Sequence, residues 1–138
     1  MAIINGNSFS NSLQGTAADD IINGGAGNDD LMGGAGRDTF LFSHSGAKHV
    51  DQLLDYQPGV DRIAIDASAF GLTAGQAFSY VEGVKATSNL PTFLRQGSVG
   101  SAQVIMFDPD GTGPQRAGML CHFNPFAGNT TAADFAIL

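Results

Sequence analysis

The sequence predicts an all-β protein that begins with a short coil of parallel strands and continues in an antiparallel, β-sandwich-like carboxy-terminal part. Near the amino terminus, glycine recurs every nine residues, and each repeat ends in a short apolar segment. Further along, apolar segments alternate with turn-forming residues, as they do in chains of short strands. The length of 138 residues suits a single domain, with the coil at 1–42 and the remainder at 43–138.

The charge and composition of the chain argue against some classes of binding partner. The net charge is −7, which argues against nucleic acid, and the absence of an 18-residue apolar run argues against membrane insertion. Twelve of the 13 acidic residues are Asp, a residue favoured both in turns and in sites for hard cations, so both explanations stay open. The amino-terminal MAIINGNSFSNS lacks the basic and apolar regions of a signal peptide.

Four nonapeptides align on their first glycine: GNSFSNSLQ (6–14), GTAADDIIN (15–23), GGAGNDDLM (24–32) and GGAGRDTFL (33–41). Position one is occupied by Gly6, Gly15, Gly24 and Gly33. Position six is occupied by Asn11, Asp20, Asp29 and Asp38, and position eight by Leu13, Ile22, Leu31 and Phe40. The first block matches least well, which is typical of the end unit of a stacked array.

Each position has a physical role. The glycine-bearing first six residues predict a turn, and the last three predict a very short strand whose middle side chain points inward. Two nonapeptides then make one full turn of a flattened coil, and successive coils lie about 4.8 Å apart. Turn 6–11 should therefore stack on turn 24–29, and turn 15–20 on turn 33–38.

The stacked turns combine the ligands that Ca²⁺ prefers. Calcium takes six to eight oxygens and accepts a mixture of carboxylate and carbonyl donors. Two stacked turns can supply that set whereas one cannot, so we expect about two ions held by the four repeats. Without them, crowded carboxylates such as Asp19, Asp20, Asp29 and Asp30 would repel one another.

GGAGNDDLM and GGAGRDTFL resemble the GGxGxDxUx repeat of the RTX (repeats-in-toxin, hemolysin-type calcium-binding) family, as found in the carboxy-terminal domains of type I-secreted proteins such as serralysins. The resemblance implies a short parallel β-roll with Ca²⁺ as cofactor. It makes Asp20, Asp29 and Asp38 side-chain ligands, and Asn11 departs from the Asp of the pattern. The full set expected at the metal sites is Asn11, Asp19, Asp20, Gly24, Gly25, Gly27, Asn28, Asp29, Gly33, Gly34, Gly36, Asp38 and Asp51.

The segment HVDQLLDYQPGVDRIAIDASAFG (49–71) predicts two strands around a tight turn at Pro58–Gly59. It also resembles the segment that follows the roll in serralysin-type proteases. In that resemblance Asp51 and Asp61 either cap the last turns or bind a terminal ion, and a purely structural cap explains Asp61 at least as well.

Three further strands are predicted in AFSYVEGV, TFLRQG and AQVIMFD, and FDPDGTGPQRAGMLCHF (107–123) predicts a hairpin. Asp108 and Asp110 resemble the start of an EF-hand loop, but Met119 stands where that loop needs a Glu, so a hairpin turn is favoured. We predict no catalytic or zinc role for His44, His49, Cys121 or His122, and the chain carries no enzyme motif.

The carboxy-terminal NTTAADFAIL (129–138) has two explanations. An acidic residue followed by four apolar ones resembles the signal read by type I secretion machinery, and it comprises Asp134, Phe135, Ala136, Ile137 and Leu138. A terminal strand that docks on the sheet explains the same residues. Thr131 and Asp134 also fit a capping box.

The leading functional hypothesis is a secreted module that folds on binding Ca²⁺ outside the cell and supports type I secretion. An alternative is a carbohydrate-binding module, because the chain is also similar to the alginate-binding R-modules of mannuronan C5-epimerases. The cations Arg37, Lys48, Arg62, Lys85, Arg95 and Arg116 are too few and scattered to predict a stripe for a polyanionic extracellular polysaccharide. A third reading is a free-standing small secreted protein. The open edge of a short roll also offers a surface for self-association.

Overall fold

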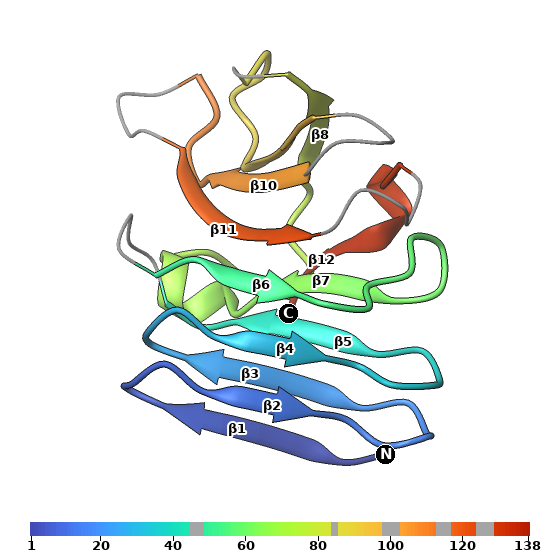
Figure 1. Ribbon diagram of the computed structural model, residues 1–138. Helices are drawn as coiled ribbons and strands as arrows, with labels where there is room; N and C mark the ends of the chain where they lie inside the picture. Colours follow the sequence, from blue (N-terminus) through green and yellow to red (C-terminus); the bar gives the residue numbers. More distant parts are fainter. Residues whose placement is uncertain (45–48, 84–85, 98–102, 113–116, 124–128) are drawn as a thin grey trace.

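The computed structural model describes residues 1–44, 49–83, 86–97, 103–112, 117–123 and 129–138. Its strands lie in two sheets, one with the order β1-β3-β5-β7-β12 and the other with the order β2-β4-β6-β11-β10-β9-β8. Figure 1 shows the amino-terminal strands stacked from the bottom of the view upward, with the later strands of the second sheet continuing the stack at the top. The predicted fold class, all-β with a parallel roll, is confirmed.

The amino-terminal coil alternates between the two sheets. Its strands are β1 (Ile3–Asn7), β2 (Ser12–Gln14), β3 (Ile21–Gly25), β4 (Asp30–Met32) and β5 (Thr39–Phe42). Odd-numbered strands pair in parallel in one sheet and even-numbered strands in the other, with partners 18 residues apart, such as Ile22 with Ile4 and Leu31 with Leu13. Two nonapeptides therefore make one coil, as the repeat predicts.

Position eight of each repeat forms the core between the sheets. Ile22, Leu31 and Phe40 are fully buried, and Leu13 packs against them partly buried at the open end of the coil. Each of these side chains is the second residue of its strand, and alternating side chains of a strand face opposite sides of the sheet. The inward register predicted for this position is therefore confirmed.

The coil continues past the repeats. β6 (Asp51–Leu53) and β7 (Arg62–Ile65) form the two strands predicted around Pro58–Gly59, but each joins a different sheet, so the segment between them is a coil turn and not a hairpin turn. Leu53 lies directly beside Leu31, and Ile63 beside Phe40, which extends the core by one layer. A short 3-10 helix, η1 (Ala67–Phe70), follows β7.

The strands of the carboxy-terminal part extend the two sheets of the roll. β8 (Ser79–Glu82), β9 (Thr92–Gln96), β10 (Gln103–Asp108) and β11 (Gly118–Phe123) extend the second sheet, in which β11 runs parallel to β6. The pairs β9–β10 and β10–β11 are antiparallel, as predicted, while β8 and β9 are parallel. After the 3-10 helix η2 (Ala132–Asp134), the last strand β12 (Phe135–Ile137) returns to the first sheet and pairs in parallel with β7.

Candidate metal centre in the stacked turns

The turns between the strands stack along the two edges of the roll. We call the edge with turns 6–11 and 24–29 the first edge, and the edge with turns 15–20, 33–38 and 55–61 the second edge. The backbone N–H of Ala26 donates to the carbonyl of Asn7, and that of Ala35 to the carbonyl of Thr16, so successive turns lie in contact. The stacking predicted for both pairs of repeat turns is present.

The position-six aspartates of the repeats, together with Asp51 and Asp61 of the next coil, form a hydrogen-bonded ladder along each edge. On the first edge, Asp29 Oδ1 accepts from the Asn11 N–H at 2.7 Å, and Asp51 Oδ1 accepts from the Asp29 N–H at 3.0 Å. On the second edge, Asp38 Oδ1 accepts from the Asp20 N–H at 2.9 Å, and Asp61 Oδ1 accepts from the Asp38 N–H at 3.0 Å. One oxygen of each carboxylate therefore holds the turn of the previous coil in place.

The second oxygen of two of these carboxylates is left without a partner. Asp29 Oδ2 and Asp38 Oδ2 are buried and accept no hydrogen bond from any described residue. Burying a charged oxygen without a partner is costly, so an oxygen in this position suits contact with a cation. Carboxylate oxygens beside glycine-rich backbone are the donors that a calcium site uses, so the residues present fit Ca²⁺.

Glycine at position one leaves room for these free oxygens. A Cβ added to Gly24 would collide with Asp29 Oδ2, and one added to Gly33 would collide with Asp38 Oδ2. The backbone φ at both positions is ordinary, so space and not conformation requires glycine there. The repeat thus preserves open space around the carboxylate.

The two repeats with weaker motifs satisfy their position-six side chains differently. Asp20 Oδ2 accepts from the N–H of Thr16 at 2.6 Å and from its hydroxyl at 2.8 Å, and Asn11 Oδ1 accepts from the Asn7 N–H at 2.8 Å. The two bonds from Thr16, together with that from the Ala2 N–H, lower the pKa of Asp20. Asp20 and Asn11 are therefore engaged by their own turns, unlike Asp29 and Asp38.

Burial and mutual repulsion act on the other carboxylates. Burial raises the pKa of Asp51 to about 7, and the neighbouring charge of Asp29 adds to the effect. Burial also raises the pKa of Asp38 and of Asp61, and the charge of Asp55 contributes in both cases. In the metal-free protein these groups therefore resist ionisation, and a divalent cation relieves that cost.

Other predicted site residues lie at the rim. Asp19 and Asn28 occupy position five, and their side chains are exposed. Each still connects two coils, because Asp19 Oδ1 accepts from the Arg37 N–H at 2.9 Å and Asn28 Oδ1 accepts from the Val50 N–H at 3.0 Å. Gly25, Gly27, Gly34 and Gly36 adopt positive φ within the turns.

Two residues of the site escape the repeat pattern. Asp55 accepts from the N–H groups of Gly33 at 2.7 Å and Gly34 at 2.8 Å, so it caps turn 33–38 from the next coil. His49 Nδ1 accepts from the Gly27 N–H at 2.9 Å and caps turn 24–29 in the same way. Turn 55–61 begins and ends with Asp but is one residue longer than a repeat turn. A search for the nine-residue spacing therefore does not detect that it stacks as a repeat turn does.

The remaining candidates lie away from the ladders. Asp108 Oδ1 accepts from the Asp110 N–H at 3.3 Å in the turn that follows β10, which agrees with the predicted hairpin. Cys121 is buried while the adjacent His122 is half-buried, as their opposite faces require. Lys48, Lys85 and Arg116 lie outside the described residues. Within the described part of the chain, no three His, Cys, Asp or Glu side chains form one metal-ligating cluster, so an ion in the turns would take most of its oxygens from the backbone. No helix in the same part of the chain is long and apolar enough to cross a membrane.

Comparison with known proteins agrees with this geometry. Residues 5–40 match the model of the RTX calcium-binding nonapeptide repeat in four copies. Among 25 matching solved chains is the solution structure of the AlgE6R3 subunit of the mannuronan C5-epimerase from Azotobacter vinelandii, with 22% identity and a TM-score of 0.54. The match covers 94% of this chain and 78% of that one. None of the curated proteins matches the sequence.

The paired parallel sheets and the stacked glycine-aspartate turns define a β-roll with calcium-binding repeats. The chain carries four RTX nonapeptide repeats at residues 5–40, so the resemblance seen in the sequence is confirmed.

Proposed function

We propose that this protein is a module that folds when Ca²⁺ binds between its stacked turns. The observation that carries the proposal is the pair of buried carboxylate oxygens, Asp29 Oδ2 and Asp38 Oδ2, that have no partner among the described residues. Asp29 and its neighbours would hold an ion on the first edge, and Asp38 and its neighbours on the second. When bound, Ca²⁺ supplies the positive charge that the crowded carboxylates lack.

The size of the effect suits a folding switch. Extracellular calcium sites have a Kd on the order of 10⁻⁴ M, and free Ca²⁺ outside cells is about 1 mM. Each such site then stabilises the folded state by about 1.4 kcal/mol, so two sites contribute about 3 kcal/mol. That is a large share of the stability of a small domain, whose total is about 5–15 kcal/mol.

A calcium titration of the full chain, followed by far-UV circular dichroism and by thermal unfolding, tests the proposal. We expect strand content and melting temperature to rise together as Ca²⁺ replaces EGTA, while Mg²⁺ at the same concentration has little effect because it prefers to retain its waters. Equal strand content and equal melting temperature in EGTA and in 1–2 mM Ca²⁺ would overturn it.

The module is further proposed to act outside the cell after type I secretion, with Asp134–Leu138 as the recognised segment. The support is the acidic residue followed by four apolar ones. The test is export of the full chain from cells with and without a type I exporter. Efficient export of a chain in which Phe135, Ala136, Ile137 and Leu138 are replaced by Ser would contradict this role.

A second candidate function is binding of a polysaccharide that carries carboxylate groups. Arg37 and Arg62 line one groove of about 220 Å³ on the second edge, together with the carboxylates of Asp61 and Asp134. A guanidinium group can bind a carboxylate through two parallel hydrogen bonds. Calorimetry with oligouronates and with neutral oligosaccharides, in 1–2 mM Ca²⁺, distinguishes the cases. Binding that is lost in Arg37→Ala supports this function, and the absence of heat with either ligand removes it.

The open end of the roll is also a proposed site of self-association. Among the described strands, β1 pairs only with β3 and so forms an edge of the first sheet. Near it, Met1, Ile3 and Phe9 are 82%, 65% and 75% exposed. An unpaired strand edge with apolar neighbours readily pairs with another chain. Sedimentation in Ca²⁺ should show dimers that Ile3→Lys abolishes, and a monomer at all concentrations would contradict the proposal.

A further inference from the structure

We propose that the last ten residues form a clasp whose docking is coupled to calcium occupancy of the second edge. The clasp comprises residues 129–138, and it closes over turn 55–61, which carries Asp61 of the second-edge ladder. The inference rests on the proposed calcium function. It adds that calcium binding favours docking of residues 129–138 on the roll, and that the docked residues strengthen calcium binding.

Asp134 is the direct link between the clasp and the ladder. Its side chain is buried, and its Oδ1 accepts from the Gly59 N–H, within turn 55–61, at 2.6 Å. Its Oδ2 accepts from the Thr131 N–H at 2.6 Å and so holds the start of η2. The carboxylate thus acts on turn 55–61 as Asp61 acts on turn 33–38, by holding a backbone N–H of the coil before it.

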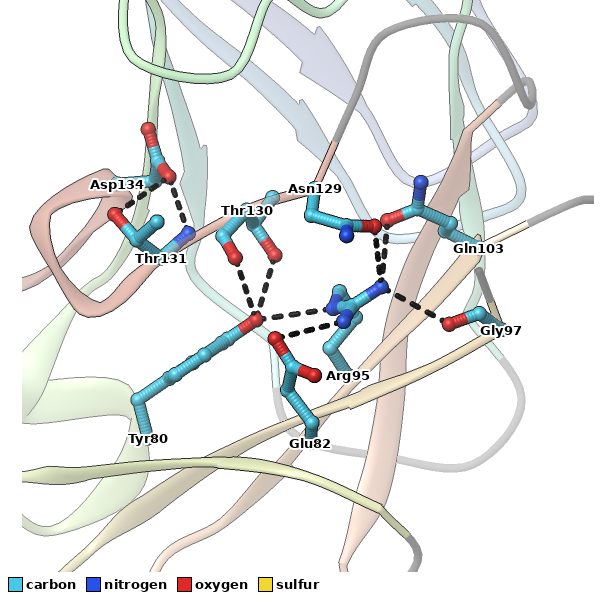
Figure 2. Close-up of polar contacts among 9 residues, drawn as sticks. All are labelled: Tyr80, Glu82, Arg95, Gly97, Gln103, Asn129, Thr130, Thr131 and Asp134. Carbon is cyan, nitrogen blue, oxygen red and sulfur yellow. Dashed lines mark hydrogen bonds and ion pairs between the residues drawn. The ribbon is translucent and has the colours of Figure 1, made fainter. Parts of the chain in front are cut away.

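A polar network fixes the clasp from the other side (Figure 2). The Tyr80 hydroxyl donates to the Thr130 carbonyl at 2.8 Å, and Arg95 Nη1 donates to Asn129 Oδ1 at 2.9 Å. Arg95 is 4% exposed and forms an ion pair with Glu82 at 2.8 Å. Burial opposes its charge, but the bonds to Glu82 and Tyr80 raise the pKa of Arg95, so it stays charged.

The strand of the clasp completes the first sheet. β12 pairs with β7, and Phe135 and Ile137 are buried in the core. The ring of Phe135 lies 5.2 Å from that of Tyr80 and 4.6 Å from that of Phe93. β7 is the strand that immediately follows turn 55–61, so any disorder in the turn reaches the strand on which β12 docks.

The coupling follows from this shared support. Turn 55–61 must be ordered both to present Asp61 to turn 33–38 and to present the Gly59 N–H to Asp134. An ion that orders the second edge therefore favours the docked clasp, and the docked clasp must raise the calcium affinity by the same factor. Asp134 contributes as a positioning residue that acts through turn 55–61.

The variant Asp134→Asn tests the coupling in the full chain, because it keeps the shape of the side chain but removes one of the two acceptor oxygens. We expect the midpoint of a calorimetric Ca²⁺ titration to rise about fivefold. Asp30→Asn is the matched control, since it removes the same charge from an exposed side chain of the roll. Tyr80→Phe, which keeps the ring beside Phe135, should shift the midpoint in the same direction by less.

Hydrogen exchange at subsaturating Ca²⁺ separates coupling from general destabilisation. We expect Asp134→Asn to lose protection in residues 55–61 and 135–138 while residues 24–29 on the first edge stay protected. Equal loss on both edges, or a midpoint equal to that of Asp30→Asn, would overturn the coupling. If the unmodified chain shows no response to Ca²⁺ at all, the calcium function itself fails; a normal response with an unchanged Asp134→Asn midpoint removes only the clasp.

Discussion

At the scale of single residues, the position-six aspartate has two separate tasks. Asp38 Oδ1 accepts from the Asp20 N–H and holds neighbouring coils together, while its Oδ2 stays buried and without a described partner. The first task needs only an acceptor, but the second needs a carboxylate. Substitution by Asn can therefore separate the structural role from the proposed metal-binding role.

Asp38→Asn should lower the stability of the calcium-loaded protein by about 1.4 kcal/mol or more, the contribution of one ion. In EGTA the same variant should be at least as stable as the parent, because Asn retains the oxygen that accepts from Asp20 and removes a buried charge. Urea unfolding in both conditions measures the difference. Asp30→Asn, on an exposed position, should change neither value, and an equal loss for Asp38→Asn in EGTA would refute its metal-binding role.

The raised pKa of Asp51 predicts a pH dependence of opposite sign with and without metal. The folded-state pKa is about 7, and that of an unfolded Asp is about 3.9. Between these two values the folded metal-free protein therefore binds more protons than the unfolded chain. Protonation of Asp51 stabilises the metal-free fold fully below about pH 4, and this stabilisation is lost as the pH rises through about 7.

In EGTA we accordingly expect more strand signal at pH 5 than at pH 8, measured by far-UV circular dichroism. In 1–2 mM Ca²⁺ the order should reverse, because protons compete with the metal for the same oxygens. Asp51→Asn should flatten part of the profile in EGTA. A strand signal in EGTA that rises with pH would contradict the assignment.

At the scale of elements, the turns provide connections between coils in addition to the short strand ladders. β2 and β4 have three residues each, so their ladders alone provide little cohesion. The turns add carboxylate-to-backbone bonds between coils, as well as the space around Asp29 Oδ2 and Asp38 Oδ2. The position-one glycine is therefore the most direct way to probe a turn.

Gly33→Ala should weaken calcium binding on the second edge by about 1–3 kcal/mol, the usual cost of overpacking, because the added methyl group would meet Asp38 Oδ2. Gly118→Ala is the matched control: its φ is not positive and no described atom lies within 4 Å of the added Cβ. Calorimetric titration of both variants measures the effect. Equal calcium affinity in the two would mean that the space beside Asp38 is not part of a site.

At the scale of the whole molecule, the local part of the architecture was predictable. The strands near 12–14, 21–23, 30–32 and 39–41 follow from a nine-residue spacing whose turn chemistry is contained in each block. The capping box of Thr131 and Asp134 was predictable as well, because it is local. The bonds of Asp55 to turn 33–38 and of Asp134 to Gly59 were not, because they depend on where distant segments come to lie. The pairing of β11 with β6 was not predictable either, because no sequence repeat relates the two strands.

Because β12 returns to the first sheet from far along the chain, the topology determines whether the coils or the docked carboxy-terminal strand form first. Ladder bonds between the nonapeptide repeats join residues 18 apart, whereas the bond from Gly59 to Asp134 spans 75 residues. Closing the longer loop costs about 1.3 kcal/mol more chain entropy, which corresponds to a roughly tenfold slower closure. After a rapid calcium jump, stopped-flow measurements should show coil formation first and burial of the Tyr80 ring against Phe135 later. The time for which the carboxy terminus stays accessible is then set by the length of the loop.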